Sequence, residues 1–119
     1  MTTFTESGLS AEILRAIGEL GFENPTPIQA KTIPHLLESD RDLVAFAQTG
    51  TGKTAAFGLP LLQKVEIADG TIQALVLCPT RELCLQISRD LANFAKYTPG
   101  LRTVAVYGGA AIDRQIREL

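Results

Sequence analysis

Residues 47–54 read AQTGTGKT and lie between the apolar stretches LVAF, residues 43–46, and AAFGLPLL, residues 55–62. An apolar strand, a glycine-rich loop, Lys-Thr and then a helix is an order typical of loops that cradle nucleotide phosphates. Glycines let backbone N–H groups approach a phosphate without a Cβ in the way. The helix that follows directs partial positive charge at the same point. The stretch therefore predicts a phosphate-binding loop.

The loop follows the consensus G-x-x-x-x-G-K-[ST], with Ala47 in place of the first glycine. The Lys53 ammonium is expected to reach the β and γ phosphates, and the Thr54 hydroxyl is expected to bind Mg²⁺. A chance glycine turn with a surface lysine is the alternative, but it leaves the strand-loop-helix order unexplained. The predicted nucleotide-binding residues of the loop are Ala47, Gln48, Thr49, Gly50, Thr51, Gly52, Lys53 and Thr54, of which Lys53 and Thr54 act on phosphate and Mg²⁺.

Strand and helix patterns alternate along the chain. Ser10 and Gly21 are typical of the start and end of one helix, and Thr26-Pro27-Ile28-Gln29 is typical of the start of the next. Pro34 is expected to kink or shorten its helix, and Pro60 is expected to bend the helix that contains it. Strands that are apolar throughout indicate an α/β fold, a parallel sheet with flanking helices. The predicted strands are 43–47, 74–78 and 103–107, and the predicted helices are 9–20, 26 onward, 53–65, 82–96 and 112 onward.

Bulk composition narrows the class of protein. The 119 residues fit one domain. Eleven basic and 13 acidic residues give a net charge of −2, which argues against binding nucleic acid by bulk charge but not against local phosphate contacts. No apolar run approaches the ~20 residues of a membrane span, and no basic residue precedes Arg15, so we expect a cytoplasmic protein with no membrane partner. Cys78 and Cys84 are interpreted as small hydrophobic residues in a reducing compartment.

Efficient hydrolysis of a nucleotide needs a carboxylate at the end of a second strand. Residues 74–78 are followed by Pro79-Thr80, and residues 103–107 by Gly108-Gly109. Glu82 and Asp113 are interpreted as acids at helix starts, where the helix dipole favours them. We therefore expect the chain to bind nucleotide without hydrolysing it efficiently.

Four stretches in this order resemble motifs of the DEAD-box ATP-dependent RNA helicases. GFENPTPIQ, with Phe4 upstream, resembles the Q motif, and AQTGTGKT resembles motif I. PTRELCLQ resembles motif Ia with Cys84 in place of alanine, and Tyr107-Gly108-Gly109 resembles the GG motif. The resemblance implies that 1–119 is a partial N-terminal RecA-like ATP-binding domain, with the Q motif at 4–29, motif I at 47–54, motif Ia at 79–86 and the GG motif at 108–109.

The chain also departs from the family pattern. TPG at residues 98–100 resembles part of a later motif but stands before the GG motif and lacks its arginine, so it is interpreted as a turn. The DEAD and SAT motifs and the second RecA-like domain are absent, and the sequence stops inside a helical pattern. We expect a fragment of a longer protein.

The resemblance implies contacts with the base. Gln29 is expected to hydrogen-bond the adenine edge and select ATP over GTP, because an amide both donates and accepts. The alternative is that Gln29 completes a capping box with Thr26. Phe22 is expected to stack on adenine, with a core aromatic as the alternative, and Phe4 is expected to pack against the Q-motif loop.

The resemblance also implies contacts with the RNA backbone, which carry little sequence preference. Thr80 and Arg81 would bind phosphate at a helix start, the alternative being a capping threonine and a solvated arginine. Gln86 would also contact RNA, and the alternative is that it is a solvated helix residue. Gly108 and Gly109 would let the backbone approach the RNA, and the alternative is that they form a turn with positive φ. The predicted RNA-binding residues are Pro79, Thr80, Arg81, Gln86, Gly108 and Gly109.

The family's sheet raises a problem for residues 1–119. Strands that carry the SAT and DEAD motifs lie between the strands of motif I and motif Ia, and they are encoded after residue 119. Unpaired strand edges favour non-native pairing or self-association. The parent protein is therefore expected to be an ATP-dependent RNA helicase using ATP and Mg²⁺, and the isolated chain a nucleotide-binding module. An unrelated phosphate-loop NTPase is a third alternative, but it leaves GFENPTPIQ and PTRELCLQ unexplained.

Overall fold

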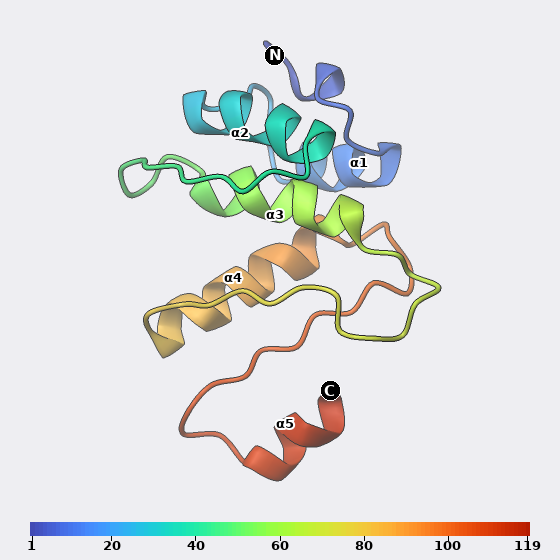
Figure 1. Cartoon of the computed structure of the whole chain (residues 1–119), viewed down its shortest axis with the longest axis vertical. Helices are drawn as coiled ribbons and strands as arrows, with labels where there is room; N and C mark the ends of the chain where they lie inside the picture. Colours follow the sequence, from blue (N-terminus) through green and yellow to red (C-terminus); the bar gives the residue numbers. More distant parts are fainter.

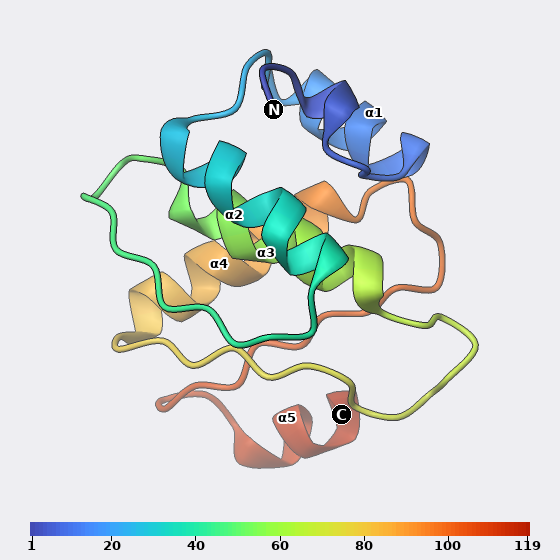
Figure 2. The same ribbon diagram turned by 45° about the horizontal axis from the view of Figure 1, so that its top comes forward.

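The computed structural model describes residues 1–119, and all of its regular structure is helical. Four helices pack together, and a fifth lies apart from them near the C-terminus (Figures 1 and 2). Helix α3 contacts both α2 and α4, and α1 contacts α4. The elements are η1 (Phe4–Glu6), α1 (Ala11–Glu19), α2 (Pro27–Glu38), α3 (Lys53–Lys64), α4 (Arg81–Phe94) and α5 (Ile112–Glu118). None of these helices is long and apolar enough to cross a bilayer.

The first two helices begin where the capping residues predict. The Ser10 hydroxyl accepts a hydrogen bond from the Ile13 N–H at 3.3 Å at the start of α1. At the start of α2, Thr26 Oγ1 accepts from the Gln29 N–H at 3.5 Å, and Gln29 Oε1 accepts from the Thr26 N–H at 3.0 Å. These reciprocal bonds form a capping box, which satisfies N–H groups that a helix start leaves unpaired. Both predicted helix starts are confirmed.

The core lies between the four packed helices. Ile33 and Leu59 have 0% exposed surface, and burying an aliphatic side chain of this size contributes about 1.5–3 kcal/mol. Gly58 of α3 allows the close approach of α4, because a Cβ at this position would lie 2.8 Å from Leu91 Cδ2. The core cluster consists of Phe4, Leu9, Ile13, Ile17, Ile33, Ala55, Leu59, Leu62, Ile87, Leu91 and Phe94.

The predicted parallel sheet is not formed, and this part of the predicted fold class is corrected. Residues 43–47, 74–78 and 103–107 contain no strand and cross the molecule as long irregular segments (Figure 1). A strand exists only when a neighbouring chain about 4.8 Å away pairs with its backbone groups. Apolar side chains of these segments stay in solvent, with Phe46 90%, Leu75 79% and Leu77 84% exposed. The apolar character of the segments predicted strands, and that prediction is wrong because a single sequence carries no information about strand partners.

The two interior prolines do not shorten their helices. Pro34 lies inside α2, which continues to Glu38, and Pro60 lies inside α3, which continues to Lys64. Each proline removes one helix hydrogen bond. Packing offsets that loss at Pro60, whose side chain is among the most completely buried of the chain. Of the two outcomes expected at Pro34, the shortened helix is wrong, and a kink stays a prediction.

Helix α5 forms over the predicted region but faces an unexpected way. Its apolar residues Ile112, Ile116 and Leu119 are 70%, 60% and 64% exposed, whereas Gln115 is buried at 7%. The helix is therefore attached through a polar side chain and not through its apolar face.

Candidate phosphate and nucleic-acid site

The loop before α3 has the geometry expected of a phosphate cradle. Gly50 and Gly52 have φ of 80° and 82°, values that favour glycine over residues with a Cβ. Thr51 Oγ1 donates to the Gln48 carbonyl at 2.6 Å, which closes the turn. Gly52 is the N-cap of α3 and provides no side chain to cap it. The first N–H groups of α3 therefore remain available to an anion.

Two side chains at this helix start are free to act on a ligand. Lys53 is exposed, and the ion pairs of the chain use the cations of Lys64, Lys96 and Arg114 instead. Thr54 is half-buried, and its hydroxyl takes part in none of the side-chain hydrogen bonds of α3. An ammonium and a hydroxyl beside open backbone N–H groups fit a phosphate with its magnesium ion.

Gln29 lies directly against this loop. Its Nε2 donates to the Gly52 carbonyl at 3.1 Å, while its Oε1 belongs to the capping box with Thr26. A Cβ on Gly52 would collide with the Gln29 amide. An amide has two N–H groups and two lone pairs, so one of each remains for another partner. The capping-box interpretation of Gln29 is confirmed, and contact with adenine stays a prediction.

Phe22 packs among core aromatics. Its ring centroid lies 6.0 Å from those of Phe4 and Phe94. The ring is half-buried, whereas Phe4 is 4% exposed. This is the core-aromatic alternative for Phe22, and stacking on adenine stays a prediction. Phe4 packs against Phe22, in the loop that it was expected to contact.

A second group of predicted residues meets at the start of α4. Thr80 caps this helix through a hydrogen bond from the Leu83 N–H at 3.2 Å, as its alternative interpretation predicts. Arg81, the first helical residue, is exposed and belongs to none of the ion pairs of the chain. Its guanidinium lies so close to Gly109 that a Cβ there would collide with it. Gly109 has φ of 87°, so its predicted turn with positive φ is confirmed.

The other predicted RNA-binding residues are exposed but less closely joined. Pro79 and Gly108 are exposed beside Thr80 and Gly109, and Gln86 is exposed further along α4. Sequence reasoning did not single out Gln115, whose amide holds the backbone of Tyr107, the residue before the two glycines. No local pattern in the sequence marked Gln115, because its partner is the backbone of a residue eight positions earlier.

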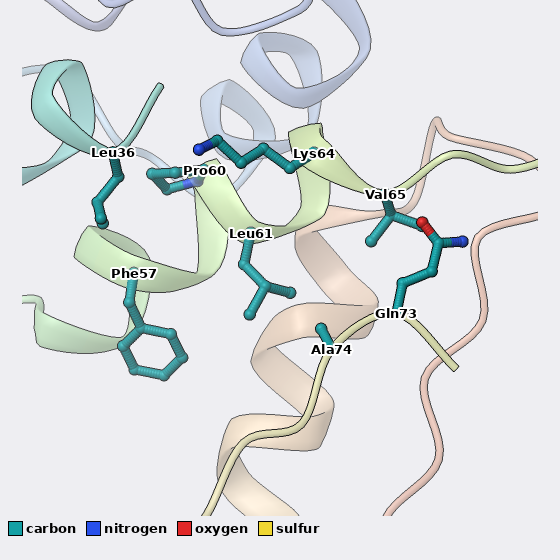
Figure 3. Close-up of a pocket in the computed structure, with 8 residues that line it drawn as sticks. All are labelled: Leu36, Phe57, Pro60, Leu61, Lys64, Val65, Gln73 and Ala74. Carbon is teal, nitrogen blue, oxygen red and sulfur yellow. The ribbon is translucent and has the colours of Figure 1, made fainter. Parts of the chain in front are cut away.

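A cavity of about 400 Å³ lies elsewhere, beside the C-terminal half of α3 (Figure 3). Phe57, Leu61 and Val65 line it from α3 and the residue that follows, and Ala74 closes it from the segment 74–78. Its lining is mostly apolar, and neither Lys53 nor Gln29 contributes to it. The cavity is therefore not part of the phosphate site.

The site geometry defines a candidate nucleotide-binding protein, and comparison with known proteins gives its family. A family model described as DEAD/DEAH box helicase matches residues 26–119. The chain belongs to the DEAD/DEAH box helicase family.

The similar curated proteins are bacterial helicases that are much longer than this chain. The DEAD-box ATP-dependent RNA helicase CshA of Geobacillus kaustophilus is 52% identical over 119 residues, which are 100% of this chain and 25% of the relative. The ATP-dependent RNA helicase DeaD of Escherichia coli is 52% identical over 118 residues, 99% of this chain and 19% of the relative. The chain thus spans a quarter or less of these relatives.

Solved structures of the same family have a similar backbone. A DEAD box protein from the hyperthermophile Methanococcus jannaschii matches with a TM-score of 0.89 and 42% identity, covering 100% of this chain and 32% of that one. Dbp5 of S. cerevisiae, bound to RNA and ADP BeF3, matches with a TM-score of 0.79 and 39% identity over 82% of this chain and 25% of that one. The backbone thus follows the path of longer DEAD-box proteins even where the strands are unpaired.

Proposed function

We propose that residues 1–119 bind an adenine nucleotide and part of an RNA backbone, as a portion of the first RecA-like domain of an ATP-dependent RNA helicase. The proposed parent protein unwinds or remodels RNA with the energy of ATP hydrolysis. The names of the relatives CshA and DeaD support this activity. The motif boundaries 4–29, 47–54, 79–86 and 108–109 belong to the same proposal, as does the cytoplasmic location expected of a chain with two free cysteines.

The hydrogen bond from Gln29 to Gly52 is the observation that carries the proposal. It joins the residue proposed to read the adenine edge to the loop proposed to hold the phosphates, 23 positions further along the chain. Lys53 and the backbone N–H groups at the start of α3 would hold the phosphates, and Thr54 would hold Mg²⁺. The bound ion would neutralise phosphate charge. A proposed base contact of Phe22 would use the part of the side chain that the core leaves exposed.

The proposal predicts binding without efficient turnover for this chain. Neither segment 74–78 nor segment 103–107 is followed by a carboxylate that could act on a magnesium ion or on water. ATP hydrolysis by residues 1–119, measured with and without RNA, is therefore expected to stay at background. RNA-stimulated hydrolysis by this chain would contradict that part of the proposal.

Isothermal titration with ADP and GDP tests the adenine site. The wild type is expected to prefer ADP, and Gln29→Ala is expected to lose that preference. The preference is a ratio within one variant, so lost capping stability, about 0.5–2 kcal/mol, does not disturb it. Gln73→Ala is the control, because Gln73 hydrogen-bonds only Glu66 and Asp69 in an exposed loop. Equal affinity for both nucleotides in the wild type would refute the base assignment.

We also propose that the exposed apolar segments 43–47 and 74–78 let two copies of this chain associate. Phe46, Leu75 and Leu77 are each more than three-quarters exposed, which leaves apolar surface beside unpaired backbone. Light scattering after size-exclusion chromatography is expected to give a mass that rises with protein concentration. A constant monomer mass over a hundredfold range would contradict this proposal without affecting the nucleotide site.

A further inference from the structure

Gln115 makes an unusual attachment between α5 and the chain before it. The Tyr107 N–H donates to Gln115 Oε1 at 3.0 Å, and Gln115 Nε2 donates to the Tyr107 carbonyl at 2.9 Å. One amide side chain thus satisfies both backbone groups of a single residue, as an adjacent strand would. Gln115 is 7% exposed, so these bonds are largely shielded from water.

Other contacts at α5 are weaker than this pair. The apolar side chains of the helix are at least 60% exposed, so hydrophobic burial holds little of it in place. The Arg102 guanidinium donates to the Glu118 carbonyl at 3.4 Å in an exposed setting. The ion pair between Arg114 and Glu118 lies within the helix and ties it to nothing else. Gln115 is therefore the main buried link between α5 and the segment that ends at Tyr107.

The residue that Gln115 holds leads directly into the two glycines. Gly109 follows with φ of 87° and lies against the Arg81 guanidinium with no space for a Cβ. Arg81 is exposed at the first position of α4 and forms no ion pair. Gln115 thus holds the Tyr107 end of the turn, and the Gly109 end of the turn lies against the unpaired guanidinium of Arg81.

We propose that Gln115 is a positioning residue that holds the Gly108-Gly109 turn against Arg81 so that both meet the same phosphate of a single-stranded RNA. This inference rests on the proposed RNA contact of that turn. A turn fixed before binding saves the entropy that ordering it on the ligand would cost. Gln115 itself lies behind Tyr107 and touches no RNA. Its loss therefore weakens binding without removing a phosphate contact.

The test compares Gln115→Leu with Ile116→Gln. Leucine keeps an uncharged side chain one atom shorter and removes both hydrogen bonds to Tyr107, while Ile116→Gln is an uncharged change at an exposed position of the same helix. Binding of a fluorescein-labelled oligouridine is measured by anisotropy at several salt concentrations, together with ADP affinity. Gln115→Leu is expected to weaken RNA binding about five- to tenfold, the scale of two lost hydrogen bonds, and to leave ADP affinity unchanged.

The salt dependence separates positioning from direct contact. Each phosphate contact to single-stranded nucleic acid contributes about 0.7 to the slope of log affinity against log salt. Arg81→Ala is expected to lower the slope by that amount, whereas Gln115→Leu keeps the wild-type slope. Gln115→Met, which keeps an uncharged side chain of the same length and removes both hydrogen bonds, replaces Gln115→Leu if that variant does not fold.

Two results would overturn the inference. RNA affinity in Gln115→Leu equal to that in Ile116→Gln would show that the turn needs no support from Gln115. A lower slope in Gln115→Leu would make Gln115 a direct contact. Failure of the wild type to bind RNA would instead refute the proposed RNA contact. Hydrogen exchange of the Gly108 and Gly109 amides, expected to be faster in Gln115→Leu alone, then still tests whether Gln115 holds the turn.

Discussion

The side-chain amide of Gln29 donates a hydrogen bond to the backbone carbonyl of Gly52 across 3.1 Å. The same carbonyl also accepts from the Ala56 N–H at 3.1 Å, the first hydrogen bond of α3. Gln29 therefore contacts the phosphate loop at the point where the loop becomes a helix. If Gln29 also contacts adenine, as proposed, one side chain links the base of the nucleotide to the loop that holds its phosphates.

Gly52→Ala is predicted to damage the loop more than Gly50→Ala. Both glycines have positive φ, so both substitutions carry a backbone strain of about 1 kcal/mol. Only at Gly52 would the new methyl group also collide with the Gln29 amide, because nothing lies within 4 Å of a Cβ at Gly50. Thermal unfolding is expected to show the larger loss for Gly52→Ala. Adding Gln29→Ala to Gly52→Ala is expected to recover part of it, and equal losses at the two glycines would contradict the collision.

Two helical glycines are predicted to respond to alanine in opposite directions. At Gly18 in α1 nothing lies within 4 Å of a new Cβ, so Gly18→Ala is expected to stabilise the protein by about 0.5–1 kcal/mol through helix propensity. At Gly58 the new Cβ would lie 2.8 Å from Leu91 Cδ2, and Gly58→Ala is expected to destabilise the packing of α3 on α4. Urea unfolding measures both changes. A stabilised Gly58→Ala would show that α4 moves away at little cost.

Helix positions could be predicted from the sequence because their signals are local. Ser10, Thr26 and Thr80 each cap a helix with a side chain that bonds an N–H three residues further on. The phosphate loop is equally local, since Gly50 and Gly52 need only their own φ values. These features depend on residues a few positions apart, and a single sequence contains them all.

Strand partners could not be predicted in the same way. Residues 74–78 have the apolar character of a buried strand, yet Leu75 and Leu77 are 79% and 84% exposed because no chain pairs with this segment.

The orientation of α5 could not be predicted for a related reason. The spacing of Ile112 and Ile116 indicates an inward apolar face, but Gln115 finds the two backbone groups of Tyr107 and turns inward instead. In both cases the structure depends on a contact with a backbone segment that the local sequence pattern does not contain.

The cluster of Glu19, Lys96 and Tyr97 is predicted to make stability depend on pH at both extremes. The Lys96 ammonium at 2.8 Å and the Tyr97 hydroxyl lower the pKa of Glu19 from its ordinary value of 4.5. The same carboxylate raises the pKa of Lys96 above 10.5. The contribution of Glu19 is therefore present above pH 4.5 and is lost as pH falls through its lowered pKa. The contribution of Lys96 is present below pH 10.5 and is lost as pH rises through its raised pKa.

Thermal melts of wild type and Glu19→Gln over a range of pH measure this dependence. The substitution is expected to lower the melting temperature slightly at neutral pH and not at all at the acid extreme. The effect is small and decreases in 1 M salt, because the Lys96 and Glu19 side chains are 60% and 42% exposed. Glu23→Gln is the control, since Glu23 takes part in none of the ion pairs. A pH-independent difference between wild type and Glu19→Gln would contradict the linkage.

The Cys78 thiol is predicted to react slowly with alkylating reagents, and the neighbouring Cys84 is predicted to slow this reaction further. Partial burial is the main cause that raises the pKa of Cys78 above its ordinary value of 9.0, and the adjacent thiol of Cys84 raises it further. Only a thiolate is alkylated, so Cys78 is expected to react with iodoacetamide more slowly than an unfolded cysteine near pH 8. Cys84→Ala is expected to speed that reaction and to lower its pH midpoint, while burial keeps the midpoint above 9.0.

Mass spectrometry of the peptide containing Cys78 measures the rate of alkylation. Wild type and Cys84→Ala unfolded in urea are the control, because Cys78 should then react at the same rate in both. An unchanged midpoint in folded Cys84→Ala would show that the two thiols do not interact.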